Sequence, residues 1–113
     1  MNTKKKGIYK FIMFQEDEGD YCAVCLTLNL VEWGKNPDKL LTSINEAAES
    51  YILGVVKNDF PDEVLNRPAP EKYWNMAIKN YPLVYKTKEK KSTGSDFFSF
   101  SSKPYSYGSF VTA

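Results

Sequence analysis

The sequence contains no histidine among its 113 residues. Histidine is the usual general base near neutral pH, so its absence removes most catalytic triads. The glycine patterns of phosphate-binding loops, G-x-x-x-x-G-K followed by Ser or Thr and G-x-G-x-x-G, are also missing. We therefore expect a protein that is not an enzyme and that has neither a cofactor nor a nucleotide site.

Long hydrophobic runs and an excess of one charge are missing as well. No apolar stretch approaches the ~18 residues of a membrane-spanning helix, and the mean hydropathy is −0.46. Fifteen basic and 14 acidic side chains leave a formal charge of +1, so no global field favours nucleic acid or an anionic membrane. Residues 1–6 lead into Gly7 and a strand-like pattern rather than an apolar signal core. We expect a soluble cytoplasmic protein without membrane contact.

Cysteine is scarce, with only Cys22 and Cys25 in a C-x-x-C spacing. This spacing occurs in redox pairs and in zinc sites, but redox pairs usually open a helix and a zinc site needs two further ligands. Here the pair lies in a strand-like run, where residues three apart point to opposite faces. We expect two reduced thiols, buried or half-buried, and no metal. The acidic segment Glu16–Asp20 lacks the spacing of a calcium loop.

The first third of the chain predicts three short strands. Ile8–Gln15 mixes aromatic and branched residues as a first strand, and Tyr21–Leu26 returns as a second. Glu16–Asp20 between them is polar and holds Gly19, which can adopt a left-handed conformation, so it predicts a hairpin turn. A third strand is expected within Thr27–Gly34.

One long helix follows. Asn36 can cap it, Pro37 suits its first position, and Asp38 complements the positive end of its dipole. We expect the helix to end near Lys57. Apolar residues recur through it at spacings of three and four, forming the side that would cover the sheet: Leu40, Leu41, Ile44, Ala47, Ala48, Tyr51, Ile52, Val55 and Val56.

The second half of the chain predicts less regular structure. Glu71–Tyr81 indicates a short helix that Pro82 would end, and Leu83–Thr87 alternates like an edge strand. Residues 1–91 would then form one domain, followed by a flexible tail over 92–113 that is rich in serine and aromatic residues. The predicted fold is α+β, with a three-stranded antiparallel sheet covered by one long helix (β-β-β-α), then a short helix, an edge strand and the tail.

A lysine run near the C-terminus offers one route to a function. Beside an aromatic tail, such a run can contact single-stranded nucleic acid, although most lysine runs are solvated segments. Trp33 and Trp74 could stack on bases, but single aromatics at strand and helix positions more often pack in a core or at its rim. RNA binding is therefore the alternative hypothesis, with these lysines as its contacts: Lys86, Lys88, Lys90 and Lys91.

The order of a strand, an acidic turn with glycine, an aromatic-led strand, a strand ending in Trp-Gly and a capped helix resembles the N-terminal domain of HicB-like antitoxins of type II toxin–antitoxin systems. The resemblance covers Ile8–Val56. It departs from the family at Thr27–Leu30, where a run of proline, leucine and glycine is usual, and at Lys35–Pro37, where an aspartate or asparagine and a threonine are common. The matching positions are Tyr9 to Phe14, Glu16, Asp17, Gly19, Asp20, Tyr21, Ala23, Gly34, Ile44, Glu46, Ala47, Ser50, Tyr51 and Ile52.

The resemblance implies a homodimer that covers the active site of a small basic RNA-cleaving toxin of the HicA-like type. Acidic side chains complement a surface that binds RNA, although the same acids can simply keep a turn soluble. After Phe60 only one short helical pattern follows, too little for a DNA-binding ribbon-helix-helix or helix-turn-helix, so DNA binding is not expected. The residues expected to contact the toxin are Glu16, Asp17, Glu18 and Asp20.

Overall fold

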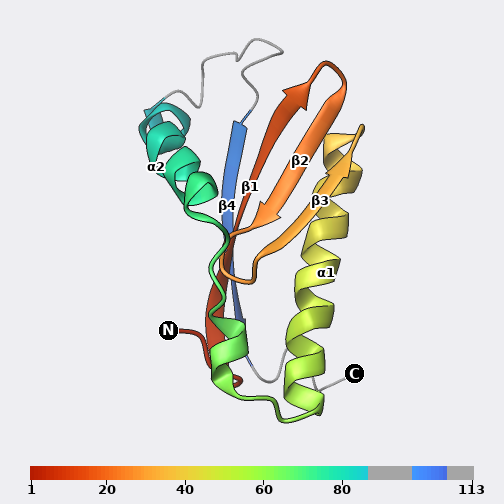
Figure 1. The fold of residues 1–113 in the computed structure, drawn as a ribbon, viewed down its shortest axis with the longest axis vertical. Coiled ribbons are helices and arrows are strands. Elements are labelled where there is room, and N and C mark those ends of the chain that lie inside the picture. Colours follow the sequence, from red (N-terminus) through yellow and green to blue (C-terminus); the bar gives the residue numbers. More distant parts are fainter. Residues whose placement is uncertain (87–97, 107–113) are drawn as a thin grey trace.

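The computed structural model describes residues 1–86 and 98–106, which form one four-stranded sheet with a helix on each face (Figure 1). The strand order is β3-β2-β1-β4, and every neighbouring pair is antiparallel. This confirms the α+β class. The elements in chain order are β1 (Lys6–Asp17), β2 (Asp20–Cys25), β3 (Leu30–Gly34), α1 (Pro37–Lys57), the 3-10 helix η1 (Asp62–Leu65), α2 (Glu71–Lys86) and β4 (Phe98–Ser106).

The hairpin between β1 and β2 forms where the sequence predicts it. Gly19 adopts φ +80°, the left-handed region that residues with a Cβ rarely enter. Asp17 pairs with Asp20 across the turn, and Phe14 pairs with Cys22 further along the ladder. The register shifts once between Gln15 and Asp17, as in a β-bulge. The turn therefore fixes which side chains of β1 and β2 share a face.

Two hydrophobic cores lie on opposite faces of the sheet, because side chains alternate along a strand. Tyr9 and Phe11 of β1 are buried with the apolar side of α1. Ile12 of β1 is buried in the second core, which α2 covers with Ala77. Figure 1 shows α1 running beside β3 along the length of the sheet and α2 lying beside β4.

Helix α1 has the predicted bounds and cap. The Asn36 side chain accepts a hydrogen bond from the Lys39 backbone N–H at 3.0 Å, and Pro37 occupies the first turn. The Asn58 backbone N–H bonds back to Gly54 at the other end. The buried residues all belong to the predicted apolar side: Leu40, Ile44, Ala48, Ile52 and Val55.

The predictions for residues 71–87 are partly wrong. The short helix exists, but Pro82 does not end it, and α2 continues to Lys86. Proline removes one backbone hydrogen bond and its ring crowds the carbonyl four residues earlier, which is costly and can kink a helix. The remaining backbone hydrogen bonds can nevertheless continue the helix beyond it. The edge strand expected at Leu83–Thr87 is therefore replaced by helix at residues 83–86, while Thr87 lies outside the described residues.

The edge strand is formed instead by β4, within the stretch 92–113 that we expected to be a flexible tail. Phe98 and Phe100 pair with Phe14 and Ile12 of β1 and pack into the α2-side core. Tyr105, on the opposite face, is 5% exposed and belongs to the α1-side core. The prediction of a tail outside the domain is wrong for residues 98–106, and the rest of that stretch lies outside the described residues.

The N-terminus is fixed by the side chain of Asn2, which is 8% exposed. Its Nδ2 donates to the Leu65 carbonyl at 3.2 Å, and its Oδ1 accepts from the Ile8 N–H at 2.9 Å. Gly7 lies directly against this group, where an added Cβ would be 2.6 Å from the Tyr105 hydroxyl oxygen and closer still to Asn2 Oδ1. The close approach explains why position 7 needs glycine.

Replacing the buried Ile44 by aspartate should unfold the domain. Ile44 is 0% exposed beneath the sheet, so Ile44→Asp would bury an unpaired carboxylate at a cost of about 4 kcal/mol or more. Thermal denaturation followed by circular dichroism measures the loss. The control is Ser50→Asp on the exposed side of the same helix, which should melt like the wild type; an unchanged melting curve for Ile44→Asp would contradict the packing described.

Two glycine-to-alanine substitutions should change stability in opposite directions. Gly7→Ala meets Asn2 and Tyr105 and should destabilise the protein by about 2 kcal/mol. Gly54→Ala lies within α1 with no atom within 4 Å of the new Cβ, so it should stabilise the protein by about 1 kcal/mol through helix propensity. Urea denaturation measures both. Equal effects of the two substitutions would contradict the close packing at Gly7.

Candidate protein-binding surface

The predicted acidic residues gather at the β1–β2 hairpin, at one end of the sheet (Figure 1). Glu16, Asp17 and Glu18 are exposed. Asp20 forms an ion pair with Lys35, with Nζ and Oδ1 2.7 Å apart, and this hydrogen bond raises the pKa of Lys35. Among the described residues the other three carboxylates have no ion pair. The hairpin therefore carries uncompensated negative charge.

These carboxylates do not form a metal site. Within residues 1–86 and 98–106, no three acidic or cysteine side chains are grouped so that they could hold a metal ion. A flexible, hydrated carboxylate group of this kind interacts with a partner mainly through its electrostatic potential. The chemistry open to the hairpin is attraction of a positively charged surface.

Trp33 lies beside the hairpin on the edge strand β3. Its side chain is 62% exposed, and in the ladder it pairs with Cys22, two residues from Asp20. Since Cys22 belongs to the α2-side core, Trp33 points to that face of the sheet. Trp74, by contrast, is half-buried against that core and acts as a packing residue. The acidic hairpin and one exposed tryptophan thus lie toward the same end of the sheet.

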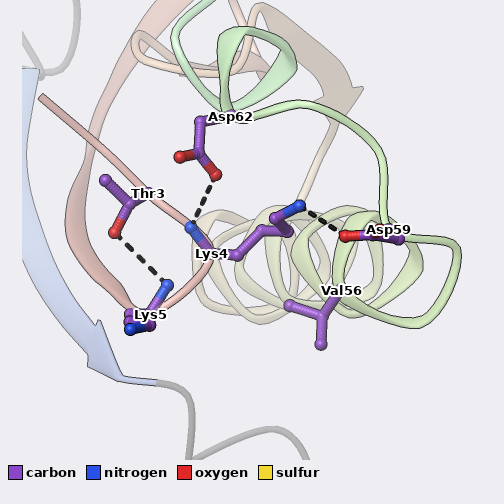
Figure 2. Close-up of a pocket in the computed structure, with 6 residues that line it drawn as sticks. All are labelled: Thr3, Lys4, Lys5, Val56, Asp59 and Asp62. Carbon is purple, nitrogen blue, oxygen red and sulfur yellow. Dashed lines mark hydrogen bonds and ion pairs between the residues drawn. The ribbon is translucent and has the colours of Figure 1, made fainter.

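A pocket of about 750 Å³ lies at the opposite end, between the N-terminal turn, the end of α1 and η1 (Figure 2). Lys4 Nζ contacts Asp59 Oδ1 at 2.7 Å, and the Lys4 backbone N–H donates to Asp62 Oδ1 at 3.0 Å. The hydrogen bond from Lys4 lowers the pKa of Asp59. Because these charged groups bind one another, we interpret the pocket as a structural clasp between the N-terminus and the end of α1.

The two cysteines lie in different cores, as the strand alternation predicts. Cys22 is buried on the α2 side and Cys25 on the α1 side, and both are free thiols. Burial raises the pKa of Cys22 to about 11 and also raises the pKa of Cys25. Thiolates are scarce at such values, so neither residue has the properties of a redox or metal-binding cysteine.

The lysines of the RNA-binding hypothesis are only partly described. Lys86 is the last residue of α2, while Lys88, Lys90 and Lys91 lie outside the described residues. The sequence reasoning missed Lys72 and Lys79, which are exposed on α2. They are about two helical turns apart and therefore lie on one side of the helix. In the sequence, Lys72, Lys79 and Lys86 follow one another at intervals of seven residues, and this spacing could have indicated a basic side of the helix.

Comparison of the chain with protein-family models, curated proteins and solved structures found no match in any of the three. The HicB-like resemblance therefore stays a prediction. Within the described residues, no helix has both the length and the apolar character needed to cross a membrane. The described residues establish an α+β domain with an acidic hairpin and an exposed tryptophan at one end of its sheet.

Both thiols should be unreactive in the folded protein. Burial on opposite faces and a raised pKa protect Cys22 and Cys25, so Ellman's reagent at pH 8 should label neither thiol in the native state. In urea both should react rapidly. Fast labelling without denaturant, or a disulfide between the two residues under mild oxidation, would contradict their placement on opposite faces.

Proposed function

We propose that this protein is a HicB-like antitoxin-type binding module, which captures a small basic RNA-cleaving toxin and covers its active site. The observation that carries the proposal is that exposed Glu16, Asp17 and Glu18 at the hairpin and exposed Trp33 on β3 lie toward the same end of the sheet. A protein that cleaves RNA must bind phosphates, so the surface around its active site is basic. An acidic hairpin is complementary to such a surface.

The two parts of this surface have different roles in binding. Carboxylates that remain hydrated steer a basic partner toward the hairpin and raise the association rate, a contribution that decreases as the salt concentration rises. A tryptophan that becomes buried on binding contributes a larger share of the affinity, because tryptophan is enriched at binding hot spots. The hairpin would therefore select the partner, and Trp33 would hold it.

The lysines of α2 support a second candidate function, direct binding of nucleic acid. Lys72 and Lys79 are exposed on one side of the helix, and lysine side chains are common phosphate contacts in nucleic-acid complexes. The isolated protein would then retain single-stranded RNA at low salt. A gel shift that disappears in Lys72→Ala with Lys79→Ala, and that does not respond to changes at the hairpin, distinguishes this candidate from the first.

A tagged full chain should retain a small basic protein from its native extract at low salt. Replacing Glu16, Asp17 and Glu18 together by lysine should weaken the complex on the order of hundredfold, chiefly through slower association at low ionic strength. Surface plasmon resonance over a series of salt concentrations measures this effect.

The control for these charge changes is at the other end of the molecule. Glu63 is exposed in η1, and Glu63→Lys should be compared with the single variant Glu18→Lys, which changes the net charge equally. Only the hairpin variant should weaken the complex. Retention of the same partner with unchanged affinity by the triple variant would remove the hairpin from the interface.

A further inference from the structure

Strand β3 is an end strand of the sheet that lacks two of the features that commonly protect an edge, lysine and proline. It pairs with β2 on one side, and no strand within residues 1–86 and 98–106 pairs with its other side. The opposite end strand, β4, contains Lys103 and Pro104, residues that discourage further strand pairing. Leu30–Gly34 contains neither lysine nor proline.

The charge of Glu32 lies on the α1 side of the β3 edge. Its Oε1 accepts a hydrogen bond of 2.6 Å from the Ser43 hydroxyl of α1, so the carboxylate is held against the helix. On the other face of β3, Trp33 is exposed and the neighbouring Val31 is half-buried. The two flanks of the edge therefore differ, with a carboxylate on the α1 side and apolar side chains on the other.

The surface of α1 beside Glu32 contains a shallow groove lined in part by acidic side chains. This groove of about 300 Å³ runs over the first turns of α1, and Ser43, the partner of Glu32, is one of its lining residues. Together with Glu32, the groove presents three carboxylates and one ammonium group. The lining residues are Asp38, Lys39, Thr42, Ser43 and Glu46.

We propose that an extended segment of the basic partner adds to β3 as a fifth strand. Side chains of an added strand alternate between the two faces of the sheet. Basic side chains of the segment would reach Glu32 and Glu46 on the α1 face, and apolar ones would pack on Trp33 on the other. The inference rests on the proposed function and specifies the recognised element: a segment in which basic and apolar residues alternate.

A second copy of this chain fits the same edge less well. Antiparallel pairing of two β3 strands about their centre would place Glu32 directly opposite Glu32 of the other copy. Like charges in directly opposed positions destabilise a strand pair, and the acids lining the groove would add to the repulsion. Charge complementarity therefore favours a foreign basic strand.

The test uses the full chain and a capped heptapeptide in which lysine and valine alternate. Amide hydrogen exchange, read by NMR, should slow at Leu30–Gly34 when the peptide binds, since an added strand protects the amides of an edge. The amides of Phe98–Ser106 should be unaffected. A peptide of the same composition, with its lysines and valines in two separate blocks, should bind more weakly and give no protection.

Trp33→Lys should weaken peptide binding by roughly tenfold or more, because it removes an apolar contact and adds charge to the edge. Ile78→Lys is the matched control, since Ile78 is 69% exposed on α2 and the charge change is the same. Both variants should melt like the wild type. Glu46→Lys should weaken binding where Glu63→Lys does not, which tests the α1 flank separately.

Four results would overturn the inference: binding without protection at Leu30–Gly34, equal binding of the two peptides, unchanged binding by Trp33→Lys, or protection that arises without peptide as the protein concentration rises. The last result would identify a second copy as the occupant. If the natural partner binds through the hairpin but the amides of Leu30–Gly34 gain no protection in that complex, the proposed function stands and the added strand fails. If the edge amides are protected but the hairpin triple variant binds normally, the added strand stands and the hairpin contact fails.

Discussion

The alternation of side chains along β1 builds both hydrophobic cores. Tyr9 and Phe11 face α1, while Ile12 faces α2, and β1 also pairs with β2 on one edge and β4 on the other. A slip of one residue in either ladder would send every side chain of the slipped strand to the wrong face. The Gly19 turn prevents this slip on the β2 side, so the chain requires a left-handed conformation at that one position.

The central place of β1 also decides which parts of the sheet are left for binding. Since β2 and β4 occupy both of its edges, β3 becomes an end strand. Helix α2 covers the β4 side of one face of the sheet (Figure 1). On β3, at the other side of the sheet, Trp33 remains exposed. The same pairing that builds the cores thus leaves an unpaired edge and an exposed aromatic ring on β3, toward the end of the sheet that carries the acidic turn.

Elements that depend on neighbouring residues could be predicted from the sequence, whereas elements that depend on residues far apart in the chain could not. The hairpin, α1 and its cap were predicted correctly, because Gly19, Asn36 and Pro37 act on neighbouring residues. Strand β4 was missed, because its partner β1 lies at the other end of the chain. Its alternation of Phe98 and Phe100 with serines was visible, but it stood in a serine-rich stretch that is typical of a tail. For helix α2 the sequence predicts an end at Pro82, but the helix continues through this proline to Lys86.

The candidate site could likewise be predicted only where its residues are adjacent in the sequence. The acids of the hairpin could be selected from sequence because they are contiguous, but no local pattern reveals that β3 is an end strand or that Trp33 is exposed beside them. The ion pair between Asp20 and Lys35 is exposed and contributes little stability. The ion pair neutralises the charge of Asp20, so the negative charge of the hairpin lies on Glu16, Asp17 and Glu18. Hydrated charge acts mainly on association, whereas a buried ring and a paired strand act on dissociation. Under the proposed binding mode, salt concentration would govern how fast a basic partner arrives, and the β3 edge would govern how long it stays.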